Sequence, residues 1–292
     1  MQIAEIDTVE FSEPIERLTR DERNAAKLMG RSEVRFLVDK YYAMQENRIR
    51  TAGQVRSMID EPNACLSWLA RQDLALEKRV GSMLTCWSKE NPIAAWAQQI
   101  VGIGPIISAG LSAHIDIEKA PTAGHIFRFA GLVDGIVWNK GEKRPWNADL
   151  KCLTWKIGQS FMKVRGVSDR TFYGMVYERR KAMEQTRNAA GEFKTQAEKA
   201  LTAKSYKRVT VAKTEYEAGK LPPGHIDARA RRYAVKLFLS HWWEIAYEQH
   251  HGREAPSPYA IGVLGHGHYI SPEFVIRYEA GEVSQAEAEA LL

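Results

Sequence analysis

The chain has little cysteine and no long hydrophobic run. Its 292 residues include three cysteines, Cys65, Cys86 and Cys152, whose number and spacing fit neither a zinc site nor a disulfide framework. We therefore expect a reducing compartment, the cytoplasm, with each cysteine a small core residue. No apolar run approaches the roughly 18 residues that a membrane helix needs. The acidic N-terminus also lacks a basic-then-apolar signal, so the sequence predicts no membrane partner.

A clear metal or cofactor site is also lacking. The histidines that could offer imidazole ligands near the C-terminus are His241, His250, His251, His266 and His268. A zinc site needs several ligands at suitable spacing, and no carboxylates accompany these histidines at a regular interval. We expect them to serve helix ends, turns and packing. The sequence thus predicts neither a metal nor another cofactor, with a histidine metal site as the alternative.

Extreme charge and biased composition are absent as well. The chain is 45% hydrophobic and 26% charged, as in ordinary globular proteins, and its length allows one large domain or two small ones. The net charge of +5 and the pI of about 9.0 mildly favour a polyanionic partner. A localised basic patch would make that argument stronger.

Apolar residues recur at helical spacing along most of the chain, which predicts an all-α fold. Apart from the helices beside a central glycine turn, the expected helical segments are residues 32–50, 54–59, 66–87, 122–132, 147–163, 172–196 with a break near Gly191, 197–219 and 225–243. The first residues, 1–20, are expected to be a loose lead-in, and the Ala/Glu-rich C-terminal tail to fray.

Three regions follow from this pattern. We assign residues 1–90 to an N-terminal helical arm, 91–165 to a helical core built on the glycine turn, and 166–292 to a helical C-terminal extension with a Pro/Gly/His-rich tail. The long helices of the arm are expected to pack within the chain. A homodimer formed through them is the alternative.

The core is organised around a glycine hairpin between two helices. Gly102 and Gly104 flank Ile103, and glycine tolerates the positive φ of a tight turn. Pro105 follows where a helix can begin without a backbone N–H. These four residues resemble the helix-hairpin-helix motif, which implies that backbone N–H groups at the helix N-terminus grip a DNA phosphate. An ordinary turn between two core helices is the alternative.

A basic segment follows the hairpin. Residues 140–165 are rich in lysine and arginine, and the members that we select as DNA-binding candidates are Lys140, Lys143, Arg144 and Lys151. Trp138 and Trp146 lie within or beside this basic loop, where they could touch bases or sugars. Together with the hairpin, these residues predict binding to the phosphate backbone of DNA, most simply double-stranded.

The order of three short motifs resembles the C-terminal domain of IS110/IS116/IS902-type transposases. The matching segments are Val101-Gly-Ile-Gly-Pro105, Phe129-Ala-Gly-Leu132 and Trp146-Asn-Ala-Asp-Leu-Lys151. The resemblance implies a helix-hairpin-helix DNA-binding scaffold from a mobile element or phage. It does not extend to the family's RNase H-like domain. The family's nucleophilic serine has no counterpart either, because residues 133–146 contain no Ser, Thr, Cys or Tyr. We therefore predict no catalytic residues.

An enzyme acting on nucleic acid is the second hypothesis, and a structural or interaction protein is the third. The segment Pro121-Thr-Ala-Gly-His-Ile-Phe-Arg128 is similar in order to helix-hairpin-helix DNA glycosylases. Their catalytic aspartate is replaced here by Thr122 or Ala123. Asp116 and Asp134 are near in sequence but out of register. A non-catalytic DNA-binding protein is therefore the leading interpretation, with a glycosylase-like or recombinase-like enzyme as the alternative.

Overall fold

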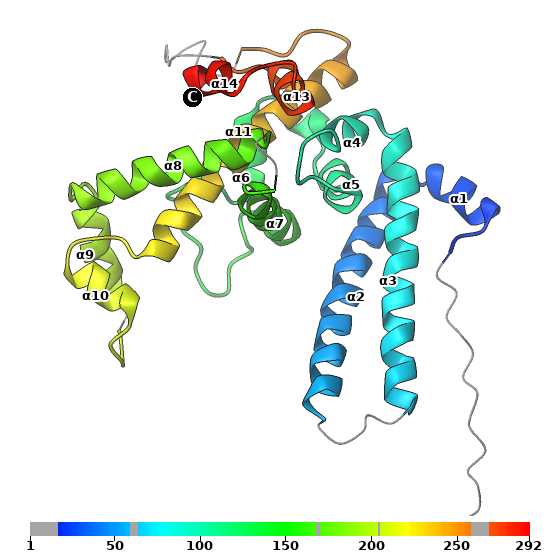
Figure 1. Ribbon diagram of the computed structural model, residues 1–292, viewed down its shortest axis with the longest axis horizontal. Helices are drawn as coiled ribbons and strands as arrows, with labels where there is room; N and C mark the ends of the chain where they lie inside the picture. Colours follow the sequence, from blue (N-terminus) through cyan, green and yellow to red (C-terminus); the bar gives the residue numbers. More distant parts are fainter. Residues whose placement is uncertain (1–16, 59–63, 168–169, 204, 258–268) are drawn as a thin grey trace, which may run out of the picture.

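The fold is all-α, as predicted. The computed structural model describes residues 17–58, 64–167, 170–203, 205–257 and 269–292, and every regular element within these ranges is a helix. A long two-helix arm, a central bundle and a smaller helical arm are visible in Figure 1, with both arms extending to the same side of the bundle. No helix within the described ranges has the length and apolar character required to span a membrane.

Some expectations lie outside these ranges. They concern residues 1–16 of the predicted lead-in, the segment 59–63 between the arm helices, and the candidate metal ligands His266 and His268. The described end of the lead-in is ordered by local contacts, because Thr19 and Glu22 form a capping box at the start of the first helix.

The long arm is an antiparallel pair formed by α2 (Arg31–Ser57) and α3 (Ala64–Glu90), preceded by the short helix α1 (Arg20–Lys27). At the end nearest the bundle the pair encloses a small apolar cluster, which also takes in side chains of α4 and α5. Its arm residues are Val34, Val38, Val80, Leu84 and Trp87. The predicted packing of these helices within the chain is confirmed, whereas the homodimer stays a prediction.

The segment predicted as two helices, 32–50 and 54–59, is a single helix. Gly53 is the position in it with the lowest helix propensity, because glycine costs about 1 kcal/mol relative to alanine inside a helix. No proline interrupts the segment, however, and the Thr51 hydroxyl lies 3.3 Å from the Asp73 carboxylate of α3. Contacts with the neighbouring helix therefore outweigh the local preference for a break.

The central bundle contains most of the core. Its elements are α4 (Pro92–Ala97), α5 (Pro105–His114), the 3-10 turn η1 (Ile117–Lys119), α6 (Ala123–Phe129), α7 (Ala148–Val164), α8 (Phe172–Ala189) and α11 (Pro223–His251). The central helix is α11, which packs against α4, η1, α6, α7 and α8. Phe238 of α11 packs against the aromatic rings of Trp96, Phe161 and Tyr173, which come from α4, α7 and α8.

The apolar helix predicted over 225–243 is confirmed and is longer than expected. It begins at Pro223, a residue that fits the first turn of a helix. It continues to His251 and ends at Gly252, whose φ of +63° provides a left-handed cap. The buried aromatic residues in its second half explain why the helix continues past the predicted end.

The smaller arm consists of α9 (Lys194–Ala203) and α10 (Val211–Glu217). The predicted break near Gly191 is confirmed, since α8 ends at Ala189 and Gly191 has a φ of +80°. The polar stretch 197–219 forms parts of two helices rather than one. A small cluster attaches the arm, formed by Phe193, Leu221 and Ile226.

The C-terminal segment packs onto the bundle as α13 (Pro272–Ala280) and α14 (Gln285–Leu291). Its buried side chains, Val275, Tyr278 and Ala288, belong to the main core cluster. The expectation of a frayed tail was wrong. The buried side chains of α13 and α14 attach the tail to the core, and Ser284 caps the last helix. The same core cluster includes residues on both sides of the predicted boundary at 165.

Candidate nucleic-acid interface

The glycine hairpin connects α4 to α5. Gly102 has a φ of +96°, a left-handed value that glycine tolerates, and Pro105 is the first residue of α5, as predicted. Gly104 differs from the prediction, because it is the N-cap of α5 with φ −92° and ψ 176°. The expectation of positive φ is thus confirmed for Gly102 and wrong for Gly104, since one left-handed residue is enough to turn the chain here.

The hairpin is packed against other elements. The Ser160 hydroxyl of α7 donates to the Gly102 carbonyl at 2.5 Å, and Ile103 is buried. The Glu279 carboxylate of α13 accepts the Val101 N–H at 2.7 Å. An anionic side chain therefore already occupies one N–H of the hairpin, the kind of donor that a DNA phosphate would use.

Glu279 links three elements through its two carboxylate oxygens. While one oxygen binds the hairpin, the other accepts the N–H of Phe172, the first residue of α8, at 2.9 Å. Burial raises the pKa of Glu279 to about 7, although both backbone donors lower it. The carboxylate is therefore an internal ligand for backbone groups of the hairpin and of α8.

The basic loop, residues 133–146, is folded around two tryptophans. The rings of Trp138 and Trp146 meet edge to face with their centroids 6.1 Å apart, and Trp138 Nε1 donates to the Glu142 carbonyl at 2.9 Å. The Glu142 carboxylate in turn accepts two hydrogen bonds from Asn139. The acidic side chain in the middle of the loop is thus engaged within the loop.

Cationic side chains lie over both indole rings. The Arg144 guanidinium is 4.9 Å from the ring centroid of Trp138, and Lys151 Nζ is 4.1 Å from that of Trp146. Such contacts contribute about 0.5–1 kcal/mol at exposed sites. In the described parts of the chain no ion pair involves Arg144 or Lys151, nor does one involve the other two predicted cations, Lys140 and Lys143.

Lys151 is the centre of a like-charged cluster. Burial lowers the pKa of Lys151, and the neighbouring charges of Arg232 and Arg144 lower it further. Arg232 comes from α11 and forms an ion pair with the highly exposed Asp134 at 2.9 Å. The cluster therefore joins the loop, α7 and α11, and an anion bound there would reduce the repulsion between its members.

Sequence reasoning missed Arg232 as a site residue. The basic first turns of α11 were visible, but nothing in the sequence placed them beside α7 or separated surface cations from internal ones. Arg229 and Arg231 are internal, with Arg229 bound to Glu184 at 2.7 Å and Arg231 bound to Asp227 at 2.8 Å.

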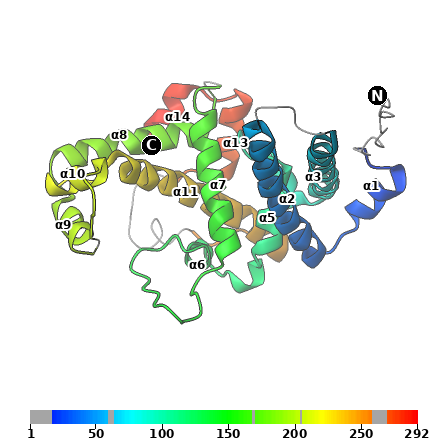
Figure 2. The ribbon, with the colours of Figure 1, turned by 90° about the horizontal axis from the view of Figure 1, so that it is seen from below.

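The predicted site residues form two groups at opposite ends of α7. Gly102 contacts Ser160 near the C-terminal end of this helix, while Lys151 lies in its first turn. Nine residues separate Lys151 from Ser160, which corresponds to about 14 Å along a helix. Figure 2 shows the basic loop extending beside α6 at one end of α7. The structure thus brings Lys140, Lys143, Arg144 and Lys151 into one region and leaves the hairpin apart from it.

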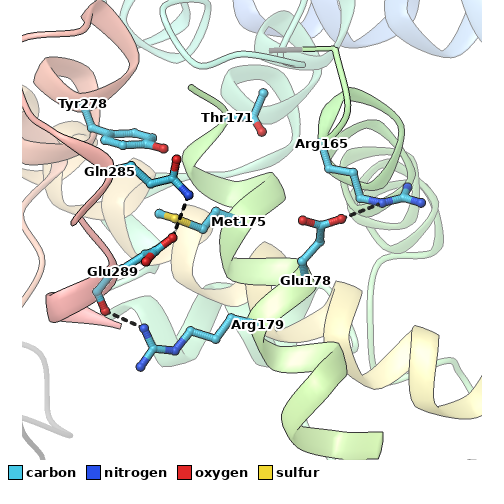
Figure 3. Close-up of a pocket in the computed structure, with 8 residues that line it drawn as sticks. All are labelled: Arg165, Thr171, Met175, Glu178, Arg179, Tyr278, Gln285 and Glu289. Atoms are coloured by element: carbon cyan, nitrogen blue, oxygen red, sulfur yellow. Dashed lines mark hydrogen bonds and ion pairs between the residues drawn. The ribbon is translucent and has the colours of Figure 1, made fainter. Parts of the chain in front are cut away.

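A cavity of about 420 Å³ lies between α8 and the C-terminal helices, and the charged side chains in its walls are hydrogen-bonded or ion-paired within the protein (Figure 3). Arg165 pairs with Glu178 at 3.1 Å, and Arg179 donates to the Glu289 carbonyl. The Gln285 amide donates to the Glu289 carboxylate at 2.7 Å. Because its lining combines two arginines with two glutamates, this cavity offers less to an anionic ligand than the cluster around Lys151.

The residues considered for catalysis make ordinary contacts. The Thr122 hydroxyl, at the position of the glycosylase aspartate, lies 2.9 Å from His125 Nδ1. The two nearby acids, Asp116 and Asp134, form ion pairs with basic side chains at 3.1 and 2.9 Å. Hydrogen bonds from Lys119 and other donors hold the pKa of Asp116 below its usual value, although burial opposes them.

The described histidines are engaged in packing and pairing. The buried His241 has Nδ1 2.6 Å from the Tyr173 hydroxyl and Nε2 2.9 Å from the Ile270 carbonyl. Since a carbonyl only accepts, Nε2 carries the proton and Nδ1 accepts from Tyr173. Burial lowers the pKa of His241 to about 4. No group of three or more potential ligands able to hold a metal is found within the described ranges.

Comparison of the chain with protein-family models, with curated proteins and with solved structures gives no match. The resemblance to transposases therefore stays a prediction, and the case for a function depends on the geometry and charge of the molecule itself.

Proposed function

We propose that this protein binds double-stranded DNA through its phosphate backbone and does not cleave it. The contact surface is formed by Lys140, Lys143, Arg144, Lys151 and Arg232, here called the α7 basic surface. The observation that carries the proposal is the like-charged cluster of Lys151, Arg144 and Arg232, in which burial and mutual repulsion lower the pKa of Lys151. A polyanion is the ligand that relieves this repulsion over several adjacent cations.

The tryptophans prepare this surface for a nucleic acid. Trp138 and Trp146 hold Arg144 and Lys151 by cation–π contacts, which limits the side-chain entropy that binding would otherwise cost. Trp138 is also 42% exposed, so that its ring can contact a sugar or base beside the phosphates. The surface contains no carboxylate pair or nucleophile, and this favours binding over strand chemistry.

The hairpin supports the surface from a distance in this proposal. Its Gly102 carbonyl binds Ser160 of α7, and Glu279 occupies the Val101 N–H. The hairpin therefore fixes the far end of the helix that carries Lys151. The transposase resemblance supports DNA as the polyanion. In this proposal, however, the phosphate contacts come from the basic loop and not from the hairpin.

Fluorescence anisotropy with a labelled DNA duplex tests the proposal. Each neutralised phosphate contributes about −0.9 to the slope of log K against log salt, so five cations predict a slope of about −4.5. Replacing Lys140, Lys143 and Arg144 by alanine should reduce the slope by up to about 3. Incubation with or without magnesium should yield neither nicked DNA nor a covalent adduct.

The matched control is the triple variant R56A/R71A/K89A, which removes the same charge from the long arm. These three cations are exposed and form no ion pair in the described structure. We expect the control to bind nearly as well as the parent protein. Equal losses in the two triple variants would contradict the assigned surface, and a flat salt dependence would contradict phosphate binding altogether.

A further inference from the structure

A second basic site adjoins the basic loop, whose Pro145 forms part of its lining. It is a cavity of about 500 Å³ between the start of α2, the end of α5, η1 and α6. This volume is within the range of about 300–1,000 Å³ that is typical of small-ligand pockets. The basic side chains that line it are Arg31, Arg35, Lys119, His125 and Arg128.

Two of these cations are available for a ligand. The acid among the described residues of the lining, Asp116, is bound by Arg31 at 3.3 Å and by Lys119 at 3.1 Å. Arg35 and Arg128 form no ion pair within the described ranges, and both are exposed. Two guanidinium groups that line one pocket and form no ion pair with a protein carboxylate are suited to bidentate binding of a phosphate.

The wall of the pocket also contains an unsatisfied polar group. His114, at the end of α5, is 4% exposed, and its Nδ1 is buried without a hydrogen-bond partner in the described structure. Burial lowers the pKa of His114; Asp39 opposes this effect and Arg35 adds to it. His114 Nε2 lies 3.6 Å from Asp39 Oδ1, so that Nδ1 is the ring nitrogen left without a partner among the described residues.

The remaining lining is apolar and includes an exposed aromatic ring. Ile115 and Ile126 form part of the wall, and Phe129 and Pro145 lie at the side of the basic loop. Phe129 is 43% exposed, and nucleic-acid bases stack on exposed aromatic rings. The pocket thus combines a phosphate-binding edge with a surface for a flat apolar group.

We propose that this pocket binds a nucleoside phosphate, with the phosphate held by Arg35 and Arg128 and the base against Phe129. The ligand comes from one of two sources, a free nucleotide or the 5′-phosphorylated end of a nucleic-acid strand. Since neither arginine belongs to the α7 basic surface, the proposal goes beyond duplex binding and stands or falls separately from it.

Calorimetric titration of the full chain with adenosine 5′-monophosphate, ribose 5-phosphate and inorganic phosphate tests the pocket. We expect the nucleotide to bind most tightly and R35Q/R128Q to weaken its binding at least about tenfold, because the variant loses two charged hydrogen-bond donors to the phosphate. Phe129→Ala should weaken the binding of the nucleotide but not that of inorganic phosphate. The control R56Q/R71Q, with the same loss of charge on the long arm, should keep the affinity.

Labelled single strands with a 5′-phosphate or a 5′-hydroxyl distinguish the two sources. A preference for the phosphorylated strand that disappears in R35Q/R128Q assigns the strand end, and nucleotide binding without such a preference assigns the free nucleotide. The variant K140A/K143A/R144A should lose affinity for duplex DNA yet keep its affinity for adenosine 5′-monophosphate. The pocket assignment is wrong if the folded parent protein binds neither the nucleotide nor the 5′-phosphate. It is also wrong if R35Q/R128Q and R56Q/R71Q weaken nucleotide binding equally, even where the protein binds duplex DNA.

Discussion

The two hairpin glycines should respond very differently to alanine. At Gly102 a φ of +96° costs an L-residue about 1–2 kcal/mol. The added Cβ would lie 3.0 Å from Ser160 Oγ and 3.3 Å from Val164 Cγ2, so that α7 would have to move slightly. Gly102→Ala should therefore lower the free energy of unfolding by about 2 kcal/mol.

Gly104→Ala is the matched control in the same turn. Its φ of −92° suits alanine, and the added Cβ would meet nothing within 4 Å. Loss of glycine at an N-cap costs about 0.5 kcal/mol, and the smaller entropy of the unfolded chain returns a similar amount. Its net effect should be near zero.

Urea unfolding followed by circular dichroism measures both variants, and duplex affinity is measured on the folded proteins. We expect both affinities to stay within about twofold of the parent, a change of less than about 0.5 kcal/mol, because the basic surface is at the other end of α7. Equal stability losses at the two glycines would refute the hairpin geometry. A folded Gly102 variant with strongly reduced affinity would restore the hairpin as the phosphate grip.

Two further predictions concern buried carboxylates. Glu184→Gln should lower the free energy of unfolding by about 3–5 kcal/mol. The reason is that Glu184 is fully buried and its carboxylate binds Arg180 at 2.6 Å and Arg229 at 2.7 Å. Thermal and urea unfolding measure the change, and a loss below about 1 kcal/mol would contradict the importance of this ion-pair network. Burial raises the folded pKa of Glu279 from 4.5 to about 7, so its contribution to stability is largest below pH 4.5 and decreases as the pH rises to about 7. The difference in unfolding free energy between parent and Glu279→Gln should accordingly fall by up to about 3 kcal/mol across that window, and a difference independent of pH would show that the carboxyl does not titrate there.

Helix positions were predictable from the sequence because amphipathic spacing is a local property. The start of α5 at Pro105, the break at Gly191 and the apolar α11 all follow from short patterns. The exceptions depend on contacts between distant segments. Gly53 stays helical beside α3, and the tail is ordered because Ala288 reaches the main core.

The candidate site was predictable only in part, for the same reason. The loop cations and Lys151 are close in sequence, so their proximity in space needed no knowledge of the fold. Arg232 is about 80 residues away and joins them only because α11 crosses α7. Glu279 is farther still, and its bond to Val101 changes the interpretation of the hairpin from an open phosphate grip to a packed support.

The overall net charge understates the positive charge of the middle of the chain, because acidic residues are concentrated at both ends of the sequence. The first 16 residues contain five acidic side chains and no basic one, and residues 269–292 contain five acidic and one basic. The intervening chain is therefore far more positive than the overall +5 indicates. Since α13 and α14 carry the acidic C-terminal charge beside the hairpin, with Glu279 bonded to Val101, the proposed DNA duplex would be repelled from that end of α7 and attracted to the end that holds Lys151. Charge placement thus favours the basic loop over the hairpin independently of any single hydrogen bond.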